Sequence, residues 1–297
     1  MQWINDLIDK SKVHEFILPN YNDSTVKLFV KRDDLIHSEI SGNKLRKLKY
    51  NLKALIENNC SGLITYGGAY SNHLLATASA CHIAKIKSIG IVRGEELNEN
   101  SNYILKKCVS LGMKLQFVSR ANFSEIKNKS GVFDYEGKNY WFVPEGGANS
   151  EGYRGSMEIV ENEEFDLVCL AQGTTTTSLG VLLSLKINQQ ILVVPVLKGF
   201  NSKKEMQNLL GDNRLFDSIQ KKVIVSDEFH FGGYAKTNLE LNDFVSEFNK
   251  FNNFSIEPIY TGKAMFALMD YLNSNKNMSN KKVLFVHTGG LFINSYH

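Results

Sequence analysis

The sequence has few of the features that define several common classes of protein. Its 297 residues include only four cysteines, which lie far apart and form no Cys-x-x-Cys pair: Cys60, Cys81, Cys108 and Cys169. Without paired cysteines or a matching histidine spacing, no zinc site is indicated and no metal is expected. Isolated cysteines are typical of buried thiols in a reducing cytosol, so we expect a cytoplasmic protein.

Long apolar runs and an excess of one charge are missing as well. The N-terminal stretch MQWINDLIDKSKVHEF carries charges throughout, which argues against a signal peptide. No apolar run approaches the roughly 20 residues that cross a bilayer. The formal net charge is +3, from 34 basic and 31 acidic residues that are interspersed along the chain. Neither a membrane nor nucleic acid is therefore an expected partner.

Two signatures of nucleotide sites are also missing. The stretch LAQGTTTTSLG, residues 170–180, runs from a predicted strand into a glycine, four threonines and a helix. It contains neither the Gly-Lys-Ser/Thr of a P-loop nor Gly-x-Gly-x-x-Gly. Backbone N–H groups and hydroxyls at a helix N-terminus nevertheless suit a phosphate. In the alternative interpretation, the threonines simply cap the helix by satisfying its free N–H groups.

What the sequence does contain is an alternation of short β-branched runs with amphipathic segments after residue 40. This pattern is typical of parallel strands joined by crossover helices, and several runs are apolar on both faces, as central parallel strands are. We therefore predict an α/β protein of two domains. Strands are predicted at residues 62–68, 88–94, 114–119, 140–147, 165–173, 191–199, 222–229 and 282–290, and helices at 71–85 and 98–111.

A second glycine-rich strand end, YGGAYSNHLL at residues 66–75, is also a candidate site. Its two glycines allow the backbone to approach a ligand, and Ser71, Asn72 and His73 follow at a helix start, where N–H groups can hold a carboxylate. Alternatively, Ser71 is a plain N-cap and His73 a polar residue of the first turn. Because ligands of open parallel sheets bind outside the carboxyl ends of the strands, both glycine-rich ends are candidates.

A pair of lysines opens the helix predicted within SEISGNKLRKLKYNLK, residues 38–53. Lys44 follows Ser-Gly-Asn directly, and Lys47 lies three residues later on the same helical face. A neighbouring cation lowers the pKa of a lysine, which lets it lose its proton and attack a carbonyl. Alone, such lysines are ordinary surface residues. Together with a phosphate site that lacks a nucleotide signature, they indicate an aldehyde that carries one phosphate, and pyridoxal phosphate is that ligand.

Several of these motifs occur together in a known family. SGNKLRKL, GGAYSNH, the Gly-Thr loop, EPIYTGKAM and VHTGG have the order and spacing of the pyridoxal-phosphate enzymes of the aminocyclopropane-carboxylate deaminase and D-cysteine desulfhydrase family. From residue 30 onward the chain resembles that family, whose fold is similar to the tryptophan-synthase β-subunit. The resemblance implies fold type II, with parallel sheets flanked by helices and pyridoxal 5′-phosphate in the interdomain cleft. It implies a large cofactor-binding domain at residues 1–49 and 151–297 and a small α/β domain at 50–150.

The resemblance also implies roles for single residues. Lys44 is expected to form the Schiff base with the cofactor, and Lys47 to meet its phosphate. Asn72 is expected to contact the 3′ oxygen of the cofactor. Ser71, Asn72 and His73 are expected to bind the substrate, with Ser71 beside its carboxylate and also a candidate for proton transfer. The phosphate cup is expected at Gly173, Thr174, Thr175, Thr176 and Thr177.

Further residues of the resemblance lie later in the chain. Thr175 stands where the family usually has glycine, so a positive φ there would strain the loop. Tyr234 and Tyr260 resemble the two active-site tyrosines, Tyr234 more loosely, although both could be core or surface residues. Thr261 and Thr288 are expected near the pyridine nitrogen of the cofactor.

The choice of reaction depends on which bond must break. D-cysteine has a Cα proton and a thiolate leaving group, whereas the cyclopropane substrate has no Cα proton and needs a stronger electron sink, which a nearby acidic residue favours. The deaminases of the family carry Glu after the tyrosine and Leu before the paired glycines, where this sequence has Thr261 and Thr288. His73 stands where they tend to have Gln. The pattern resembles the desulfhydrases and predicts elimination from D-cysteine to pyruvate, ammonia and hydrogen sulfide.

Other activities stay open at this point. The closest is aminocyclopropane-carboxylate deaminase, followed by a β-replacement synthase or a racemase-like enzyme of the same fold, and a pyridoxal-phosphate-binding protein without effective turnover. In each enzymatic case the partner is a small amino acid, D or cyclic. We expect a homodimer.

Overall fold

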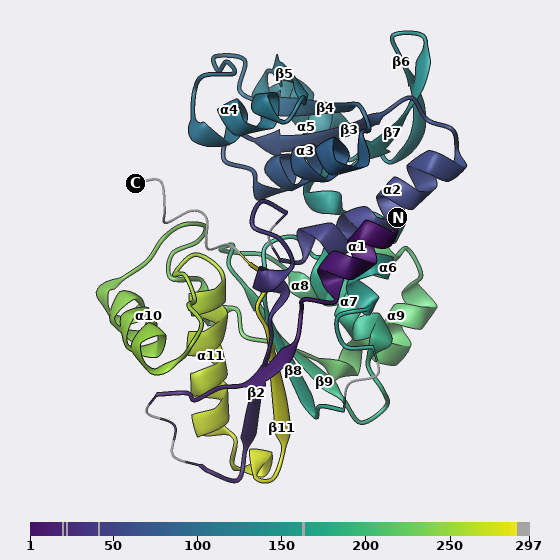
Figure 1. Cartoon of the computed structure of the whole chain (residues 1–297). Coiled ribbons are helices and arrows are strands. Elements are labelled where there is room, and N and C mark those ends of the chain that lie inside the picture. Colours follow the sequence, from purple (N-terminus) through teal and green to yellow (C-terminus); the bar gives the residue numbers. More distant parts are fainter. Residues whose placement is uncertain (20, 22, 41, 162–163, 290–297) are drawn as a thin grey trace.

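The computed structural model describes residues 1–19, 21, 23–40, 42–161 and 164–289. Two α/β parts are visible, each built on its own sheet (Figure 1). The six-stranded sheet has the order β1-β2-β11-β8-β9-β10, and the five-stranded sheet has the order β5-β4-β3-β7-β6. Between neighbouring strands, all pairings are parallel except β1 with β2 and β6 with β7. The predicted α/β class with parallel-rich sheets is confirmed.

The strands of the six-stranded sheet come from opposite ends of the described chain, and those of the other sheet lie between them in sequence. The first group is β1 (Val13–Glu15), β2 (Lys27–Lys31), β8 (Leu167–Gln172), β9 (Gln190–Pro195), β10 (Val223–Val225) and β11 (Lys282–Val286). The second group is β3 (Leu63–Gly68), β4 (Ser88–Arg93), β5 (Lys114–Val118), β6 (Gly131–Tyr135) and β7 (Lys138–Val143).

The predicted strands are present, several of them shorter than expected, while β1, β2 and β6 were not predicted. Edge strand β6 is mostly exposed, so its sequence lacks a buried apolar face. It pairs with β7 through a tight turn in which Glu136 and Gly137 both have positive φ, 52° and 76°, as two-residue hairpins of one common type require. The predicted strand end at Gly290 lies outside the described residues.

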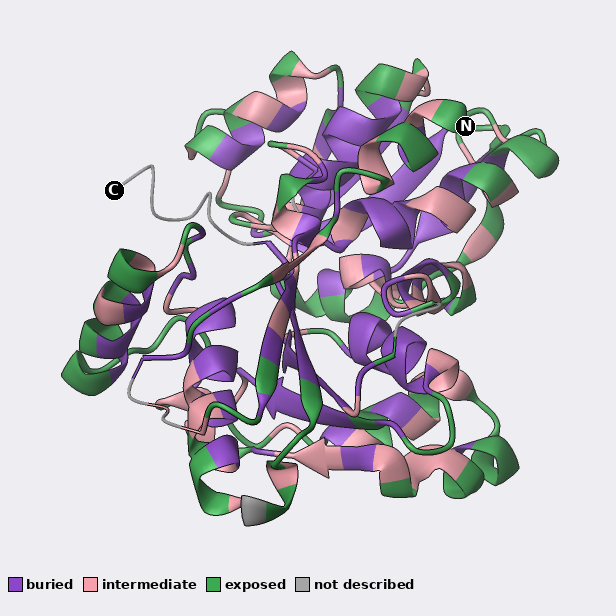
Figure 2. Cartoon of the chain, turned by 60° about the horizontal axis from the view of Figure 1, so that its bottom comes forward, coloured by how far each residue is buried: buried purple, intermediate pink, exposed green. Residues whose placement is uncertain are grey.

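Helices cover both faces of the six-stranded sheet. The α-helices of the described residues, which include those on the five-stranded sheet, are α1 (Gln2–Ile8), α2 (Lys44–Glu57), α3 (Asn72–Ala84), α4 (Tyr103–Ser110), α5 (Arg120–Ile126), α6 (Ser150–Met157), α7 (Thr176–Ser184), α8 (Ser202–Leu210), α9 (Asn213–Ile219), α10 (Leu239–Phe251) and α11 (Thr261–Ser274). Along β8, Leu167, Cys169 and Ala171 join the core under α10 and α11, whereas Val168 and Leu170 join the core under α7, α8 and α9. Figure 2 shows the buried strands between helices whose outward sides are exposed.

Helix α2 connects the two parts, because it packs against α6 and also against α3 and β7. Its start is fixed by a buried ion pair between Arg46 and Asp33, with a 2.8 Å contact between the guanidinium and the carboxylate. Both partners are almost fully buried, and a buried charge of this kind is tolerated only when it is paired and hydrogen-bonded. The domain boundaries at residues 49–50 and 150–151 stay a prediction.

Candidate active site

The structure brings the start of α2 against the Gly-Thr loop, residues 173–177, as the lysine and phosphate hypothesis requires. The Asn43 amide donates to the Thr177 hydroxyl at 2.7 Å, and Lys44 is the next residue and the first of α2. One turn along, the Lys47 ammonium donates to the Thr174 hydroxyl at 3.0 Å. Two segments far apart in the sequence therefore form one site.

The two lysines of this site have lowered pKa values. Burial lowers the pKa of Lys44 to about 8, although the Glu257 carboxylate opposes the shift. Burial, and next the positive charge of Lys44, lower the pKa of Lys47 to about 7. Lys44 can therefore lose its proton near neutral pH and act as a nucleophile. The partly buried ammonium of Lys47 also donates to the Gly146 carbonyl at 3.2 Å, and an anion beside it would favour its charged form.

The Gly-Thr loop has the features of an anion cradle. The N-terminus of α7 has no side-chain cap, and the buried Thr176 hydroxyl has no hydrogen-bond partner within the described residues. Thr175 has a φ of −69°, so the strain considered for a residue in place of glycine is not present. A Cβ on Gly173 would lie 3.0 Å from Cε1 of Tyr260, which leaves little space for a side chain there. Unpaired N–H groups and a free hydroxyl at a helix start suit a phosphate.

The turn from β3 into α3 contributes Ser71 and Asn72. Ser71 is the N-cap of α3, and its hydroxyl oxygen accepts the N–H of Leu74 at 3.3 Å. The interpretation of Ser71 as an N-cap is therefore confirmed. The cap uses only the hydroxyl oxygen as an acceptor, so the hydroxyl hydrogen can still donate to another group. Gly67 is required here, since a Cβ would lie 2.6 Å from the Ser71 hydroxyl oxygen. Both Ser71 and Asn72 are half-buried.

His73 points its side chain into the protein. Its Nε2 lies 3.0 Å from the Thr65 hydroxyl, which donates its hydrogen to the Val143 carbonyl at 2.9 Å. The network therefore assigns the hydrogen of the imidazole to Nε2, and the buried Nδ1 has no partner among the described residues. Burial first, then the charges of Lys47 and Lys44, lower the pKa of His73 to about 3. A neutral, buried imidazole is a poor partner for a substrate carboxylate, so any contribution of His73 there falls to its backbone N–H.

The two candidate tyrosines contact each other. Tyr234 lies on an exposed loop, with its ring centroid 5.8 Å from that of Tyr260 and an edge-on angle of 67°. Tyr260 directly precedes α11, and its ring lies so close to Gly173 that any side chain at that position would touch it. Burial, and next the interaction with Tyr234, raise the pKa of Tyr260, so its hydroxyl stays protonated. Tyr260 thus joins the Gly-Thr loop, and Tyr234 joins Tyr260.

Thr261 is fully buried and belongs to a network that the sequence interpretation missed. The Glu257 carboxylate accepts N–H groups from Ile259 at 2.6 Å, Tyr260 at 3.0 Å and Thr261 at 2.8 Å, and the Thr261 hydroxyl at 3.1 Å. Burial raises the pKa of Glu257 to about 7, and these donors oppose the rise. A signal was available in the sequence, since an acidic residue followed by proline, here Glu257-Pro258, is typical of the residues just before a helix.

Thr288 closes the site from the end of β11. Its carbonyl accepts the N–H of Asn43 at 3.4 Å, and a Cβ on Gly42, whose φ is 62°, would lie 1.8 Å from the same oxygen. Only glycine fits at that position, which explains the Gly-Asn before Lys44. Thr288 therefore lies beside the start of α2, while Gly290 of the same motif lies outside the described residues.

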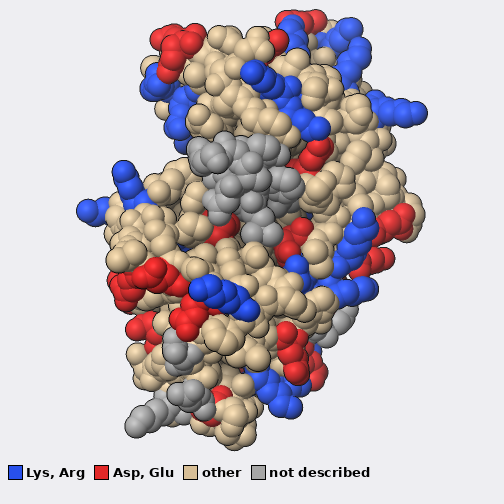
Figure 3. All heavy atoms as spheres, turned by 60° about the vertical axis from the view of Figure 1, so that its left-hand side comes forward, with Lys and Arg blue, Asp and Glu red and all other residues tan. Residues whose placement is uncertain are grey.

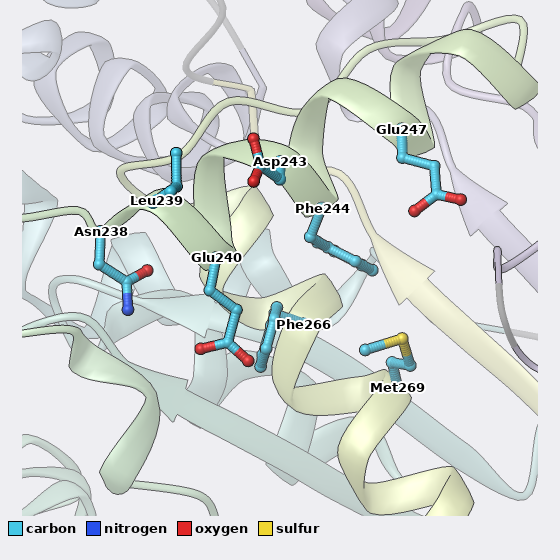
Figure 4. Close-up of a pocket in the computed structure, with 8 residues that line it drawn as sticks. All are labelled: Asn238, Leu239, Glu240, Asp243, Phe244, Glu247, Phe266 and Met269. Atoms are coloured by element: carbon cyan, nitrogen blue, oxygen red, sulfur yellow. The ribbon is translucent and has the colours of Figure 1, made fainter.

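A separate groove of about 750 Å³ lies between α10 and α11 (Figure 4). Glu240, Asp243 and Glu247 line it from α10, and Phe244 and Phe266 form part of its apolar lining. None of the candidate site residues lines this groove. Carboxylates along one side of an exposed helix are typical of a solvated face, so the groove is not the candidate active site.

The part of the chain that the structure describes holds neither a metal centre nor a membrane-spanning helix. Within it, no group of three or more His, Cys, Asp or Glu is arranged to hold a metal ion, and no helix is long and apolar enough to cross a membrane. On the face shown in Figure 3, basic and acidic side chains are interspersed.

Comparisons with known proteins assign the class. Residues 17–289 match the family model described as pyridoxal-phosphate dependent enzyme, and the chain belongs to this family. A putative 1-aminocyclopropane-1-carboxylate deaminase of Pyrococcus abyssi is 31% identical over 90% of this chain and 85% of its own. A bifunctional D-cysteine desulfhydrase/1-aminocyclopropane-1-carboxylate deaminase of Arabidopsis thaliana, described as mitochondrial, is 28% identical over 94% of this chain and 76% of its own.

A solved structure agrees with these sequence relatives. The crystal structure of an aminocyclopropane-carboxylate deaminase homologue has a TM-score of 0.76 and 25% identity, over 98% of this chain and 95% of that one. The family resemblance stated from the motifs is thereby confirmed, together with the fold class. The protein is a pyridoxal-phosphate-dependent enzyme, and its cofactor is pyridoxal 5′-phosphate.

The residues of the site fit this cofactor. A phosphate matches the Lys47 ammonium, the start of α7 and the Thr176 hydroxyl, the last two of which have no side-chain partner among the described residues. An aldehyde matches the amine of Lys44, whose pKa is lowered to about 8. When bound, pyridoxal phosphate supplies an electron sink for a substrate amino acid, and the surrounding side chains supply binding, orientation and proton transfer.

Proposed function

We propose that this chain is a D-cysteine desulfhydrase, which converts D-cysteine and water to pyruvate, ammonia and hydrogen sulfide. The observation that carries the proposal is the absence of an available carboxylate at Thr261 and Thr288. Both side chains end in hydroxyls, and both are buried beside the start of α2 or α11. A hydroxyl favours a charged pyridine ring less than a carboxylate does, which suits elimination of a good leaving group.

Glu257 is the carboxylate whose charge acts on Lys44, but its oxygens are already occupied. It accepts three backbone N–H groups and the Thr261 hydroxyl. Its lone pairs are therefore used to hold the start of α11, and the carboxylate is not free to pair with a ring nitrogen. Because the Thr261 hydroxyl is itself bonded to Glu257, this arrangement supports the absence of a free carboxylate at that position.

The proposed roles of the other residues are those that the family resemblance implies. Lys44 would hold the cofactor covalently and, as a neutral amine, would accept the Cα proton of the substrate at its Nζ. Ser71 and the N–H groups at the start of α3 would orient the substrate carboxylate, and Asn72 would contact the 3′ oxygen of the cofactor. Lys47 and residues Gly173–Thr177 hold the phosphate. Tyr260, whose hydroxyl stays protonated because burial raises its pKa, is proposed to donate a proton near the leaving group.

The test is a product assay with purified, cofactor-loaded protein. D-cysteine should release pyruvate, ammonia and sulfide in equal amounts, and far faster than L-cysteine does. Equal rates for the two enantiomers would contradict the proposal and favour a less selective synthase or racemase-like enzyme. A visible cofactor band without any product would instead favour a protein that binds pyridoxal phosphate without turnover.

Aminocyclopropane-carboxylate deaminase is the second candidate activity, and the names of two relatives of this chain support it. The putative deaminases of Pyrococcus abyssi and Pyrococcus horikoshii are 31% and 30% identical to this chain. This activity predicts α-ketobutyrate and ammonia from the cyclopropane substrate. If that rate in the wild type equals or exceeds the rate with D-cysteine, the deaminase is the correct assignment.

Three further features belong to the proposal. We place the enzyme in the cytoplasm, on its unpaired cysteines, and we propose that it forms a homodimer. The large domain is proposed to comprise residues 1–49 and 151–297 and the small domain residues 50–150. Size-exclusion chromatography with light scattering tests the dimer. Limited proteolysis tests the domain boundaries, because cleavage concentrates in exposed linkers.

A further inference from the structure

Lys263 is a fully buried lysine that lies outside the proposed catalytic set. It is the third residue of α11, and its ammonium donates to the carbonyls of His230 and Gly233, each at 2.8 Å. Both carbonyls also accept a backbone N–H, from Gly233 and Lys236 respectively. Lys263 therefore joins two consecutive turns of the segment 230–236, which we call the Tyr234 loop.

The Tyr234 loop has an unusual backbone for an exposed segment. Phe231, Gly232, Gly233 and Ala235 all have positive φ, of 51°, 94°, 120° and 55°. Phe231 and Ala235 are not glycines, and the left-handed region costs such residues free energy unless their surroundings hold them there. Because most of the loop is exposed, few buried apolar side chains can supply that restraint. The two hydrogen bonds from the buried Lys263 ammonium supply this restraint on the backbone.

A continuous set of contacts leads from this loop to the candidate active site. Tyr234 is 48% exposed, and its ring meets Tyr260 edge-on at 5.8 Å. Tyr260 in turn packs on Gly173, the first residue of the Gly-Thr loop. Among the described residues, the two hydrogen bonds of Lys263 go to the loop carbonyls and to neither tyrosine. The hydrogen-bonded connection from Lys263 to the site therefore runs through the loop.

The charge of Lys263 is balanced by Glu257 at the start of the same helix. A buried ammonium is costly unless it is hydrogen-bonded and near an opposite charge, and Lys263 has both. A methionine could fill the same space without that cost. The retained ammonium is therefore best explained by the two carbonyls that it holds.

We propose that Lys263 is a positioning residue, whose ammonium holds the Tyr234 loop in the conformation that sets Tyr234 against Tyr260. Tyr234 is then the residue that acts at the substrate, and Lys263 determines where it stands. Two neighbouring phenylalanine contacts, Phe229 and Phe231 on Phe266, fix the other side of the loop.

Hydrogen exchange tests the restraint without any enzymatic turnover. In the cofactor-free wild type, the amides of Gly233 and Lys236 should exchange at least tenfold more slowly than that of Lys281, which closes an exposed turn on Met278. In Lys263→Met, the two loop amides should exchange at least tenfold faster, and the amides inside α10 should not change. Tenfold corresponds to about 1.4 kcal/mol of opening free energy. Equal exchange of all three turn amides in the wild type would overturn the proposal.

A double-mutant cycle tests the route through Tyr234. The rate part of this test rests on the proposed function, because D-cysteine is the substrate. Lys263→Met and Tyr234→Ala should each lower kcat/KM at least tenfold, and the double variant should stay within about twofold of Tyr234→Ala, as expected for residues that act in series. Lys222→Met is the matched control, since Lys222 donates to the Leu185 carbonyl at 2.9 Å, away from the loop.

The outcomes separate the two proposals. If the wild type does not turn over D-cysteine, the proposed function fails, while the exchange measurement still decides the role of Lys263. The positioning role would be overturned if the loss of kcat/KM in the double variant equalled the product of the two single losses. Full activity in Tyr234→Ala would overturn it as well. If Lys263→Met does not fold, Lys263→Gln keeps two N–H donors without the charge, and a smaller acceleration of exchange is expected. The comparison of amide exchange at Gly233, Lys236 and Lys281 in the wild type tests the restraint without any variant.

Discussion

The starts of α2 and α11 resemble each other in their residues but differ in what they hold. Each helix start carries a lysine whose pKa is lowered by burial to about 8: Lys44, half-buried, in α2 and Lys263, buried, in α11. The Glu257 carboxylate opposes this lowering in both lysines. The lysine of α11 donates to two carbonyls, whereas Lys44 makes no side-chain hydrogen bond to the described residues. A lowered pKa alone does not identify a reactive lysine, because the hydrogen-bond partners decide whether the amine is available.

The backbone N–H groups at the two helix starts differ in the same way. In α11 the Glu257 carboxylate caps the first turn from within the protein. In α2 the N-cap Asn43 makes no side-chain cap and uses its amide for the Thr177 hydroxyl. The start of α11 is therefore closed by the chain itself, whereas the start of α2 is turned toward the Gly-Thr loop. The comparison predicts that the start of α2 serves ligand binding, whereas Glu257 serves to hold the start of α11.

The largest expected effect is at Lys44. Lys44→Ala should lower turnover by about 10³-fold, the size expected when a residue that transfers protons is removed. Borohydride reduction of the loaded wild type, followed by peptide mapping, should place the pyridoxyl group on Lys44. Lys263→Met serves as control and should keep the label. A label on Lys263 or Lys47 would show that the difference between the two helix starts was misjudged.

Lys47→Met should weaken cofactor binding by about 10- to 100-fold, because a charge-assisted contact to phosphate contributes about 1.5–3 kcal/mol. Since the pKa of Lys47 is about 7 in the cofactor-free protein, wild-type affinity should fall as the pH rises above 7. The variant should lose that pH dependence. Fluorescence titration of cofactor-free protein at several pH values measures both effects.

Lys53→Met is the control for this experiment. Lys53 lies on the same helix in an exposed pair with Glu57, 3.7 Å apart. Such a pair contributes little to stability, and its removal should leave cofactor affinity unchanged. Equal losses in Lys47→Met and Lys53→Met would mean that general charge, rather than a local contact, determines affinity.

Glu257→Gln acts on the other helix start and should destabilise the protein by about 1–3 kcal/mol, because an amide N–H would face backbone donors. Burial raises the pKa of Glu257 from 4.5 to about 7, so the folded state keeps a proton that the unfolded state releases. The contribution of this carboxyl to stability is therefore fully present below pH 4.5 and is lost as the pH rises toward 7. Urea denaturation at pH 5 and pH 8 should show a smaller difference in the variant.

The same variant sharpens the comparison at Lys44. Because the Glu257 carboxylate raises the pKa of Lys44 against the effect of burial, its removal should lower that pKa further. The rate at which cofactor-free protein takes up pyridoxal phosphate should then reach its plateau at a lower pH. An unshifted uptake profile would show that the two groups do not interact.

The sequence predicted the fold class and the clustering of the site because those features follow from local patterns. Strands of β-branched residues and glycine-rich strand ends identified the sheet edge, and the Lys44 and Gly-Thr motifs meet there as expected. The Glu-Pro pair before α11 could have indicated Glu257 as a helix cap, but not its full burial. Lys263 was missed as a positioning residue because its importance depends on burial, which the sequence around it does not reveal. The orientation of His73 was likewise not predictable, because it depends on Thr65 and on the Val143 carbonyl of a neighbouring strand.

The smallest expected effect concerns Thr175, where the sequence suggested strain. With a φ of −69° the residue has a conformation open to any amino acid, and its carbonyl accepts the N–H of Leu179 at 2.9 Å. Thr175→Gly should therefore relieve nothing. It should lower stability by at most about 1 kcal/mol, through the greater freedom of the unfolded chain, and leave cofactor affinity within twofold. Thermal denaturation and cofactor titration measure both effects. Thr174→Gly, which removes the hydroxyl that accepts from Lys47, is the variant for comparison. A gain in stability or in affinity for Thr175→Gly would mean that the Gly-Thr loop is strained after all, and that its shape differs from the one described.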